Sequence, residues 1–237
     1  DRECDLRDLV ITVIGAGNGG RAMSGYLSSQ GFSVNLIFRS LSRIFHAWKT
    51  RKLWVEVDSS FKKRVCLRSV TSEYKRAIET ADIVMIVVPA FAHKEIIEGI
   101  SPYLQKEQIV LFNPVRTWRA IETRNIIQKN RPNLKVYVGE TQTLAFTSRK
   151  VQDYGVKISK IKNTVSYCFY PEEDNHRAGR VLESIFPNFR PSTSIMETSL
   201  NNVGAIIHPA ATLLNSGSIA RRVKFKFYSN GICKHVA

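Results

Sequence analysis

A run of glycines placed directly after a short apolar stretch constrains this chain more than any other feature of its sequence. Residues 9–14 (LVITVI) are rich in β-branched side chains, which is typical of a buried parallel strand. The run GAGNGG at residues 15–20 follows at once, and residues 21–30 have a helical pattern that Gly31 can end. Residues 32–38 (FSVNLIF) predict a second strand. The segment is therefore predicted to be a strand–loop–helix–strand unit with parallel strands.

In this setting the glycines have distinct physical roles in holding a dinucleotide. Gly15 permits a tight turn, Gly17 lets the backbone approach a pyrophosphate, and Gly20 lets helix and strand pack closely. The free N–H groups at the start of the helix attract phosphate oxygens. We predict a dinucleotide-binding Rossmann domain, the alternative being a glycine-rich turn without a ligand. The cofactor-binding residues predicted here are Gly15, Ala16, Gly17, Asn18, Gly19 and Gly20.

The residues after the second strand indicate which cofactor is preferred. Domains of this kind that bind NAD usually place an acidic residue there, to bind the ribose 2′-hydroxyl. Here Arg39 and Ser40 occupy that place. A guanidinium suits a 2′-phosphate through its charge and its bidentate geometry. We therefore predict NADP, with NAD as the alternative if Arg39 only stacks on the adenine.

Strands and helices alternate through most of the remaining sequence. Strands are predicted at residues 65–70, 82–88, 108–112, 135–138, 156–161 and 165–170, with the last two as candidate antiparallel partners. Helices are predicted at residues 73–80, 92–100, 121–129 and 178–186, whereas residues 41–68 give no clear pattern. This order predicts an α/β fold with a doubly wound, mostly parallel sheet.

A Pro-rich stretch, PNFRP at residues 187–191, predicts the end of this domain. Residues 1–191 would form the dinucleotide-binding domain, and residues 192–237 would belong to a second one. Only 46 residues follow Pro191, which is too few for an independent core. The second domain is therefore expected to be incomplete or to need a partner.

Composition narrows the classes of partner. The chain has 237 residues and a net charge of +15, which suits nucleic acid or small anions. No helix-turn-helix, zinc-finger or RNP signature is present, so small anions are favoured over nucleic acid. No window has the roughly 18 apolar residues that a membrane helix needs. Four widely spaced cysteines without a CxxC pair argue against a metal site and favour a reducing cytoplasm, the alternative being pairing in an oxidising compartment.

Two loops should join the glycine run at the carboxyl edge of the sheet. Pro89, in PAFAH at residues 89–93, is expected to line the cofactor site. His93 in the same loop is expected at the surface or behind the site, in preference to a catalytic role. Arg116, in NPVRT at residues 113–117, could bind a substrate carboxylate or phosphate, the alternative being a solvated arginine.

The segment at residues 197–217 (ETSLNNVGAIIHPAATLLNSG) combines a helical pattern with an internal proline. Pro209 removes one backbone hydrogen bond and clashes with the carbonyl four residues earlier, so the helix is expected to bend or restart there. His208 would lie at that irregularity, where an imidazole could exchange protons with a ligand. A purely structural histidine fits the periodicity equally well.

Several of these segments together resemble the octopine/nopaline dehydrogenase (opine dehydrogenase) family. They are VIGAGNGGRAMSGYL at residues 13–27, VVPAFAH at 87–93, GETQTL at 139–144, and the segment at 197–217. That family couples a keto acid to an amino acid with NAD(P)H and catalyses the reverse oxidation. The resemblance implies a Rossmann domain joined to an all-α domain, with the substrate between them. His208 matches the family's catalytic general acid/base, Asn202 is a candidate substrate contact, and Glu140 of GETQTL is counted among the cofactor-binding positions.

The sequence also departs from that family. Its members are longer, so this chain is expected to carry a truncated second domain. Val115, Trp118 and Arg119 stand where the family tends to have small residues, and residues 41–64 diverge.

Three hypotheses follow. The first is an NAD(P)-dependent enzyme acting on the bond between an amino acid and a keto acid, as a homodimer or with a second chain that supplies the missing helices. The second is a dinucleotide-binding protein without turnover, or one half of a two-polypeptide enzyme. The third is a basic nucleic-acid-binding module.

Overall fold

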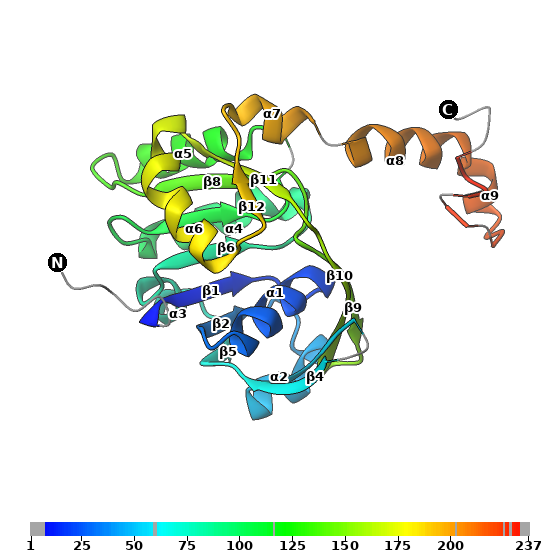
Figure 1. Ribbon diagram of the computed structural model, residues 1–237, viewed down its shortest axis with the longest axis horizontal. Helices are drawn as coiled ribbons and strands as arrows, with labels where there is room; N and C mark the ends of the chain where they lie inside the picture. Colours follow the sequence, from blue (N-terminus) through cyan, green and yellow to red (C-terminus); the bar gives the residue numbers. More distant parts are fainter. Residues whose placement is uncertain are drawn as a thin grey trace. The chain divides into compact units, whose positions relative to one another are not determined.

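An eight-stranded sheet organises the first part of the protein (Figure 1). The computed structural model describes residues 8–58, 61–115, 117–201, 203–224, 226–227 and 229–232. The chain divides into two compact units, residues 1–200 and 201–237. The predicted boundary after residue 191 lies close to this division and stays a prediction.

Six strands of the large sheet are parallel. They are β1 (Val10–Ile14), β2 (Ser33–Ile37), β5 (Ser69–Thr71), β6 (Ile83–Ile86), β7 (Ile109–Phe112) and β8 (Tyr137–Thr141). The edge is completed by β11 (Val165–Tyr170), antiparallel to β8, and β12 (Phe189–Pro191), parallel to β11. The sheet order is β12-β11-β8-β7-β6-β1-β2-β5. The predicted mostly parallel sheet is confirmed, because the central strands are apolar on both faces and need cover on each side.

Helices supply that cover on both faces. On one face, α1 (Asn18–Ser29) and α6 (Arg180–Ile185) share a core with the strands through residues such as Met23 and Leu182. The other face is covered by α3 (Lys75–Glu79), α4 (His93–Ile100), α5 (Arg119–Asn130) and α7 (Ile195–Leu200), through residues such as Ile97 and Ile127. The fold is therefore the predicted doubly wound one.

A second, four-stranded sheet comes from two distant parts of the sequence. A short helix, α2 (Phe45–Thr50), leads into the hairpin of β3 (Lys52–Val57) and β4 (Phe61–Cys66), and a later hairpin contains β9 (Phe146–Val151) and β10 (Gly155–Ile161). The sheet order is β4-β3-β10-β9, with β3 and β10 parallel. The suggested pairing of residues 156–161 with 165–170 was wrong, because β10 pairs with β9 and β3 whereas β11 pairs with β8.

One buried arginine connects the two sheets. Arg21, on α1, is fully buried, and its guanidinium donates to the carbonyls of Ala16 at 2.9 Å, Gln152 at 2.7 Å and Arg43. Burial lowers the pKa of this guanidinium, and the nearby carboxylate of Asp153 opposes that effect. The Arg21 guanidinium therefore links three segments: the glycine run, the segment after β2, and the turn between β9 and β10.

Among its described residues, the second unit contains the helices α8 (Val203–Leu214) and α9 (Ser216–Ala220). Asn215, between them, donates from Nδ2 to the carbonyls of Ala211 at 2.7 Å and Gly231 at 2.8 Å. Pro209 lies inside α8, so the expected restart at the proline was wrong. The helical segment at 195–214 is instead divided earlier, between Leu200 and Val203. A proline costs one hydrogen bond, and the remaining turns of α8 tolerate that loss.

Within the described ranges, no helix is both long and apolar enough to cross a membrane. Cys66 is an exposed free thiol and Cys168 a buried one, whereas Cys4 and Cys233 lie outside the described residues. Burial raises the pKa of Cys168 to about 11, so this thiol is unreactive at neutral pH.

Candidate functional site

The large sheet reverses its winding direction at β1. The chain runs outward from β1 to β2 and β5, and then returns to place β6 on the other side of β1. Ligands of such sheets bind at the carboxyl ends of the strands where this reversal occurs. The loops after β1 and β6 meet there, since Val87 donates its N–H to the Ile14 carbonyl at 2.9 Å.

The glycine run has the backbone conformation that its sequence predicts. Gly15 has a φ of +119°, and a Cβ there would lie 2.4 Å from the Val87 carbonyl oxygen. A Cβ on Gly20 would lie 1.6 Å from the Gly15 carbonyl oxygen. Around Gly17, in contrast, no atom of the described residues, apart from its neighbours along the chain, lies within 4 Å of such a Cβ. Gly15 and Gly20 thus allow close packing, and Gly17 faces open space at the start of α1.

The N-terminal turn of α1 is a site of partial positive charge. Gly17 is the N-cap, no side chain in the described part of the protein caps the helix, and its first turn holds no acidic residue. An uncapped N-terminus presents free N–H groups and a partial positive charge. Asn18, whose Oδ1 accepts from the Lys150 N–H at 2.9 Å, and Gly19, which lies against Leu144 and Val87, hold this turn against its neighbours. The arrangement fits the pyrophosphate of a dinucleotide, and contact with the predicted residues Gly15–Gly20 stays a prediction.

Arg39 and Ser40 are exposed just after β2, at the same edge of the sheet. The Ser40 hydroxyl lies 3.2 Å from that of Ser42. Among the described residues, Arg39 forms no ion pair with a carboxylate, so its charge is available to a ligand. A 2′-phosphate on the ribose would meet a guanidinium at this position.

The loop after β6 contains one exposed and one buried candidate. Pro89 is exposed directly after the strand. His93 is fully buried at the start of α4, with Nε2 3.1 Å from the Val88 carbonyl oxygen and its ring 4.8 Å from the ring of Phe112. The expected surface location of His93 was therefore wrong, and its expected place behind the site fits this burial, because the imidazole packs beneath the loop.

Glu140 is fully buried at the carboxyl end of β8 and has its oxygens engaged by the protein. Oε1 accepts from the hydroxyls of Thr198 at 2.9 Å and Ser199 at 2.5 Å, and Oε2 accepts from the Ala120 N–H at 3.1 Å. Burial raises the pKa of this carboxyl, although the three hydrogen bonds oppose the effect. The side chain joins β8 to the start of α5 and to α7, and a cofactor contact stays a prediction.

Sequence reasoning did not identify the partners of Glu140. Ser199 also accepts, at 2.8 Å, from the backbone N–H of Trp118, the N-cap of α5. The hydroxyls of the ETS triplet at residues 197–199 are visible in the sequence, but no local pattern links them to a carboxylate about 60 residues earlier. Arg116 and Asn202, both predicted to bind substrate, lie outside the described residues.

His208 belongs to the second unit and is exposed on α8. Its ring lies 5.4 Å from the ring of Phe227 in an edge-to-face arrangement. The described ranges contain no group of three residues able to hold a metal ion.

Comparison with known families matches both parts of the chain. Residues 11–147 match the family described as ketopantoate reductase PanE/ApbA. Residues 191–237 match the alpha-helical domain of NAD/NADP octopine/nopaline dehydrogenases. The chain belongs to the PanE/ApbA family, whose model matches more than half of its residues. Its last segment resembles the helical domain of octopine/nopaline dehydrogenases. The resemblance to opine dehydrogenases is confirmed.

Individual relatives agree with this assignment. An opine dehydrogenase of Arthrobacter sp. (strain 1C) is 32% identical over 94% of this chain and 62% of the relative. An octopine dehydrogenase of Pecten maximus is 26% identical over 88% of this chain and 55% of the relative. The chain thus spans somewhat more than half the length of these curated relatives.

Solved structures with the same fold include octopine dehydrogenase with NADH and L-arginine, and yersinopine dehydrogenase. The first has a TM-score of 0.72 at 22% identity and covers 89% of this chain and 55% of that one. The second has a TM-score of 0.79 at 12% identity and covers 97% of this chain and 60% of that one. Because both sequence identities are low, these two comparisons show only that the folds are alike.

Two alanine substitutions in the glycine run should separate packing from binding. Gly20→Ala places a Cβ against the Gly15 carbonyl and should lower the free energy of unfolding by more than about 2 kcal/mol. Gly17→Ala faces open space and should leave stability within about 0.5 kcal/mol, yet weaken NADP⁺ binding at least about tenfold. Urea unfolding and calorimetric titration measure the two effects. Equal destabilisation by both substitutions would contradict these roles.

Glu140→Ala should destabilise the first unit by at least about 2 kcal/mol, because it leaves buried donors on Ala120, Thr198 and Ser199 without an acceptor. Glu140→Gln, which keeps one acceptor and most of the volume, is the matched control and should cost less. Urea unfolding at pH 7 compares the two, and an equal loss in both variants would show that the hydrogen bonds do not matter.

The raised pKa of Glu140 gives a second expectation. A carboxyl whose pKa is higher in the folded state binds its proton more tightly there, so folding stability falls as pH rises above the ordinary value of 4.5. The decline should end once the pH passes the folded pKa. Relative to Glu140→Gln, the wild-type protein should therefore lose stability over this range. A stability difference that stays constant with pH would refute the expectation.

Proposed function

We propose that this chain is part of an NAD(P)-dependent opine-type dehydrogenase, which forms or cleaves the C–N bond between an amino acid and a keto acid. The observation that carries the proposal is the N-terminus of α1, which begins after Gly17 without a side-chain cap among the described residues. It lies at the carboxyl end of β1, where the winding of the sheet reverses. The match of residues 191–237 to the helical domain of octopine/nopaline dehydrogenases adds the substrate class. Two related structures, with NADH and L-arginine and with NADH and pyruvate, contain the same kinds of ligand.

In the proposed reaction, the amine nitrogen adds to the keto carbon, and loss of water gives an imine. When bound, the nicotinamide cofactor supplies the hydride that reduces the imine carbon. The protein must hold both substrates, exclude water and manage protons at the amine nitrogen and the departing oxygen. Each of these tasks falls to side chains outside the glycine run.

We assign the proton transfers to His208. Its exposed imidazole could accept a proton from the attacking amine and return one to the departing hydroxyl. Asn202 and Arg116 are the proposed substrate contacts, an amide suited to hydrogen bonding and a guanidinium suited to a carboxylate.

We further propose NADP as the preferred cofactor, because Arg39 is exposed and unpaired with any carboxylate in the described part of the chain. Related structures contain either NADH or NADP⁺, and we propose Arg39 as the residue that decides between them in this protein. A second copy of the chain, or additional polypeptide, is the proposed partner of α8 and α9, which expose Leu213, Leu214 and Ile219.

Turnover is tested by NADPH and NADH oxidation with a panel of keto acids and amino acids. His208→Ala should lower kcat at least about a hundredfold and leave NADPH affinity unchanged, because it removes proton transfer and not cofactor binding. His176→Ala, at an exposed histidine of the first unit, is the matched control and should keep full activity.

A loss of less than about threefold in His208→Ala would refute the assigned role. Dinucleotide binding without turnover on any substrate pair would instead favour the alternative, a binding protein or one half of a two-polypeptide enzyme.

Arg39→Ala should weaken NADP⁺ binding at least about tenfold and change NAD⁺ binding little, since the guanidinium would contact only the 2′-phosphate. Arg180→Ala, at an exposed arginine on α6, removes the same charge elsewhere and should affect neither cofactor. Calorimetric titration with each dinucleotide measures the ratio. An equal loss of affinity for NADP⁺ and NAD⁺ would show that Arg39 does not recognise the 2′-phosphate.

A further inference from the structure

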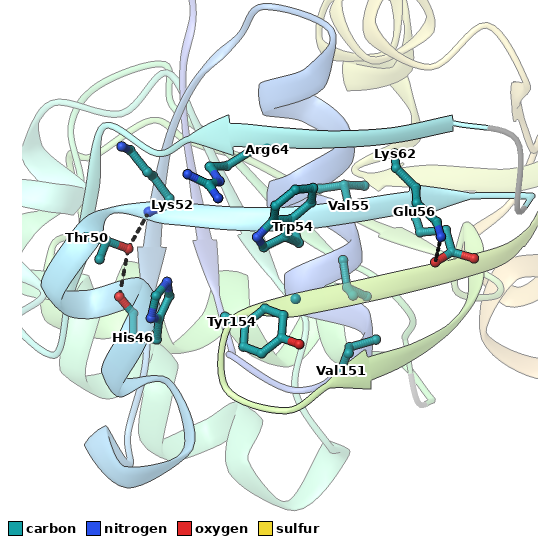
Figure 2. Close-up of a pocket in the computed structure, with 12 residues that line it drawn as sticks. His46, Thr50, Lys52, Trp54, Val55, Glu56, Lys62, Arg64, Val151 and Tyr154 are labelled. Carbon is teal, nitrogen blue, oxygen red and sulfur yellow. Dashed lines mark hydrogen bonds and ion pairs between the residues drawn. The ribbon is translucent and has the colours of Figure 1, made fainter.

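The small sheet has a hollow on the face that points away from α1. It has a volume of about 580 Å³, which lies in the range of small-molecule sites. Figure 2 shows side chains from β3, β4, α2 and the β9–β10 turn around it. Its polar and aromatic lining includes His46, Lys52, Trp54, Glu56, Arg64 and Tyr154.

Strand alternation places the polar and aromatic side chains on this face. On β3, Leu53 and Val55 are buried in the core that includes α1, whereas Lys52 and Trp54 are exposed. Trp54 pairs with Arg64 of β4 on one side and with Gly155 of β10 on the other. Because Gly155 has no side chain, the sheet is open beside the indole.

Aromatic rings line the hollow. Trp54 is 41% exposed, which is unusual for so large a side chain within a sheet, and the Arg64 guanidinium lies 4.9 Å from its ring centroid. Tyr154 stands across the hollow from Trp54 in Figure 2, and its ring lies 5.8 Å from that of His46. The His46 backbone N–H is held by the Asp153 carboxylate at 3.0 Å. A planar ring entering here would meet π surfaces from separate elements.

The charge in the hollow is positive and unequally distributed. At one end, Glu56 is paired with Lys157 at 2.7 Å and with Lys62 at 3.8 Å. The hydrogen bond from Lys157 and the charges of both lysines lower the pKa of the Glu56 carboxyl. At the other end, Lys52 and Arg64 have no carboxylate partner among the residues that the structure describes. Two positive charges therefore remain for an anion.

The hollow is separate from the dinucleotide site. None of the predicted cofactor-binding residues lines it. The core between β3 and α1 lies between them, as the contact of Val55 with Gly25 shows. Residues 41–64, to which the proposed reaction assigns no role, contribute basic and aromatic side chains to the hollow, among them Lys52, Trp54 and Arg64.

We propose that this hollow is a second binding site, for a small anion that carries a planar ring, of the size and chemistry of a mononucleotide. The ring stacks against Trp54 and Tyr154, and the phosphate lies between Lys52 and Arg64. Stacking of bases on aromatic side chains and contacts from cations to phosphates are the interactions by which proteins hold single-stranded nucleic acids, and the same two interactions are available to a mononucleotide here.

Calorimetric titration of the chain with uridine 5′-monophosphate tests the proposal, because its pyrimidine is a poor mimic of the adenosine half of NADP. We expect saturable binding that weakens at least about tenfold in Trp54→Ala and in Arg64→Ala. Trp48→Ala and Lys63→Ala are the matched controls, since each removes the same kind of group from an exposed position of this segment outside the hollow. Both should stay within about twofold of the wild-type affinity.

Parallel titrations identify which part of the ligand binds and where. Uridine and inorganic phosphate should each bind at least about tenfold more weakly than the nucleotide. Gly17→Ala should leave nucleotide binding unchanged, and Trp54→Ala should leave NADP⁺ binding at the glycine run unchanged. The proposal is overturned if the nucleotide does not bind saturably, if Trp54→Ala and Arg64→Ala bind it like the controls, or if Gly17→Ala abolishes its binding.

Discussion

The first unit depends on the guanidinium of Arg21. This side chain is fully buried and donates to carbonyls of the glycine run, of the segment after β2 and of the β9–β10 turn. A buried cation is costly unless its donors are satisfied, so these carbonyls must lie around it for the unit to fold. Both strand ends that would contact a dinucleotide are thereby fixed to the small sheet. The loop that would hold a pyrophosphate is therefore positioned before any ligand binds, which lowers the entropic cost of binding.

Glu140 has the corresponding role at the other end of the sheet. Its carboxylate joins the end of β8 to the start of α5 and to α7, the last helix of the first unit. Arg21 and Glu140 are both buried, both fully engaged by hydrogen bonds, and both next to loops at the carboxyl edge. In this protein, the buried side chains of Arg21 and Glu140 hold loops in place, whereas Arg39 and His208, two of the residues proposed to meet ligands, are exposed.

The large sheet could be predicted from sequence because its strands are short apolar runs separated by helices with regular periodicity. The small sheet could not. Strand β9 (FTSRKV) has mostly polar side chains, and β3 forms its parallel pair with β10, about 100 residues later, so no local pattern shows the partnership. The surface alternative for His93 was wrong for a related reason. An imidazole in a loop after a strand is commonly exposed, and only the packing of α4 over Phe112 buries it.

By itself, the sequence determined the βαβ unit, the conformation of the glycine run, the position of Arg39 and the resemblance to opine dehydrogenases. These features follow from local rules. A positive φ or a close approach between backbones requires a glycine at a particular position, and a strand requires side chains that repeat with its period. The tertiary structure alone decided which carbonyls surround Arg21, which donors satisfy Glu140, and that Trp54, Arg64 and Tyr154 line one hollow. Those contacts join residues far apart in the chain. The free energy that selects them comes from burial and from satisfying polar groups in three dimensions, which no local pattern records.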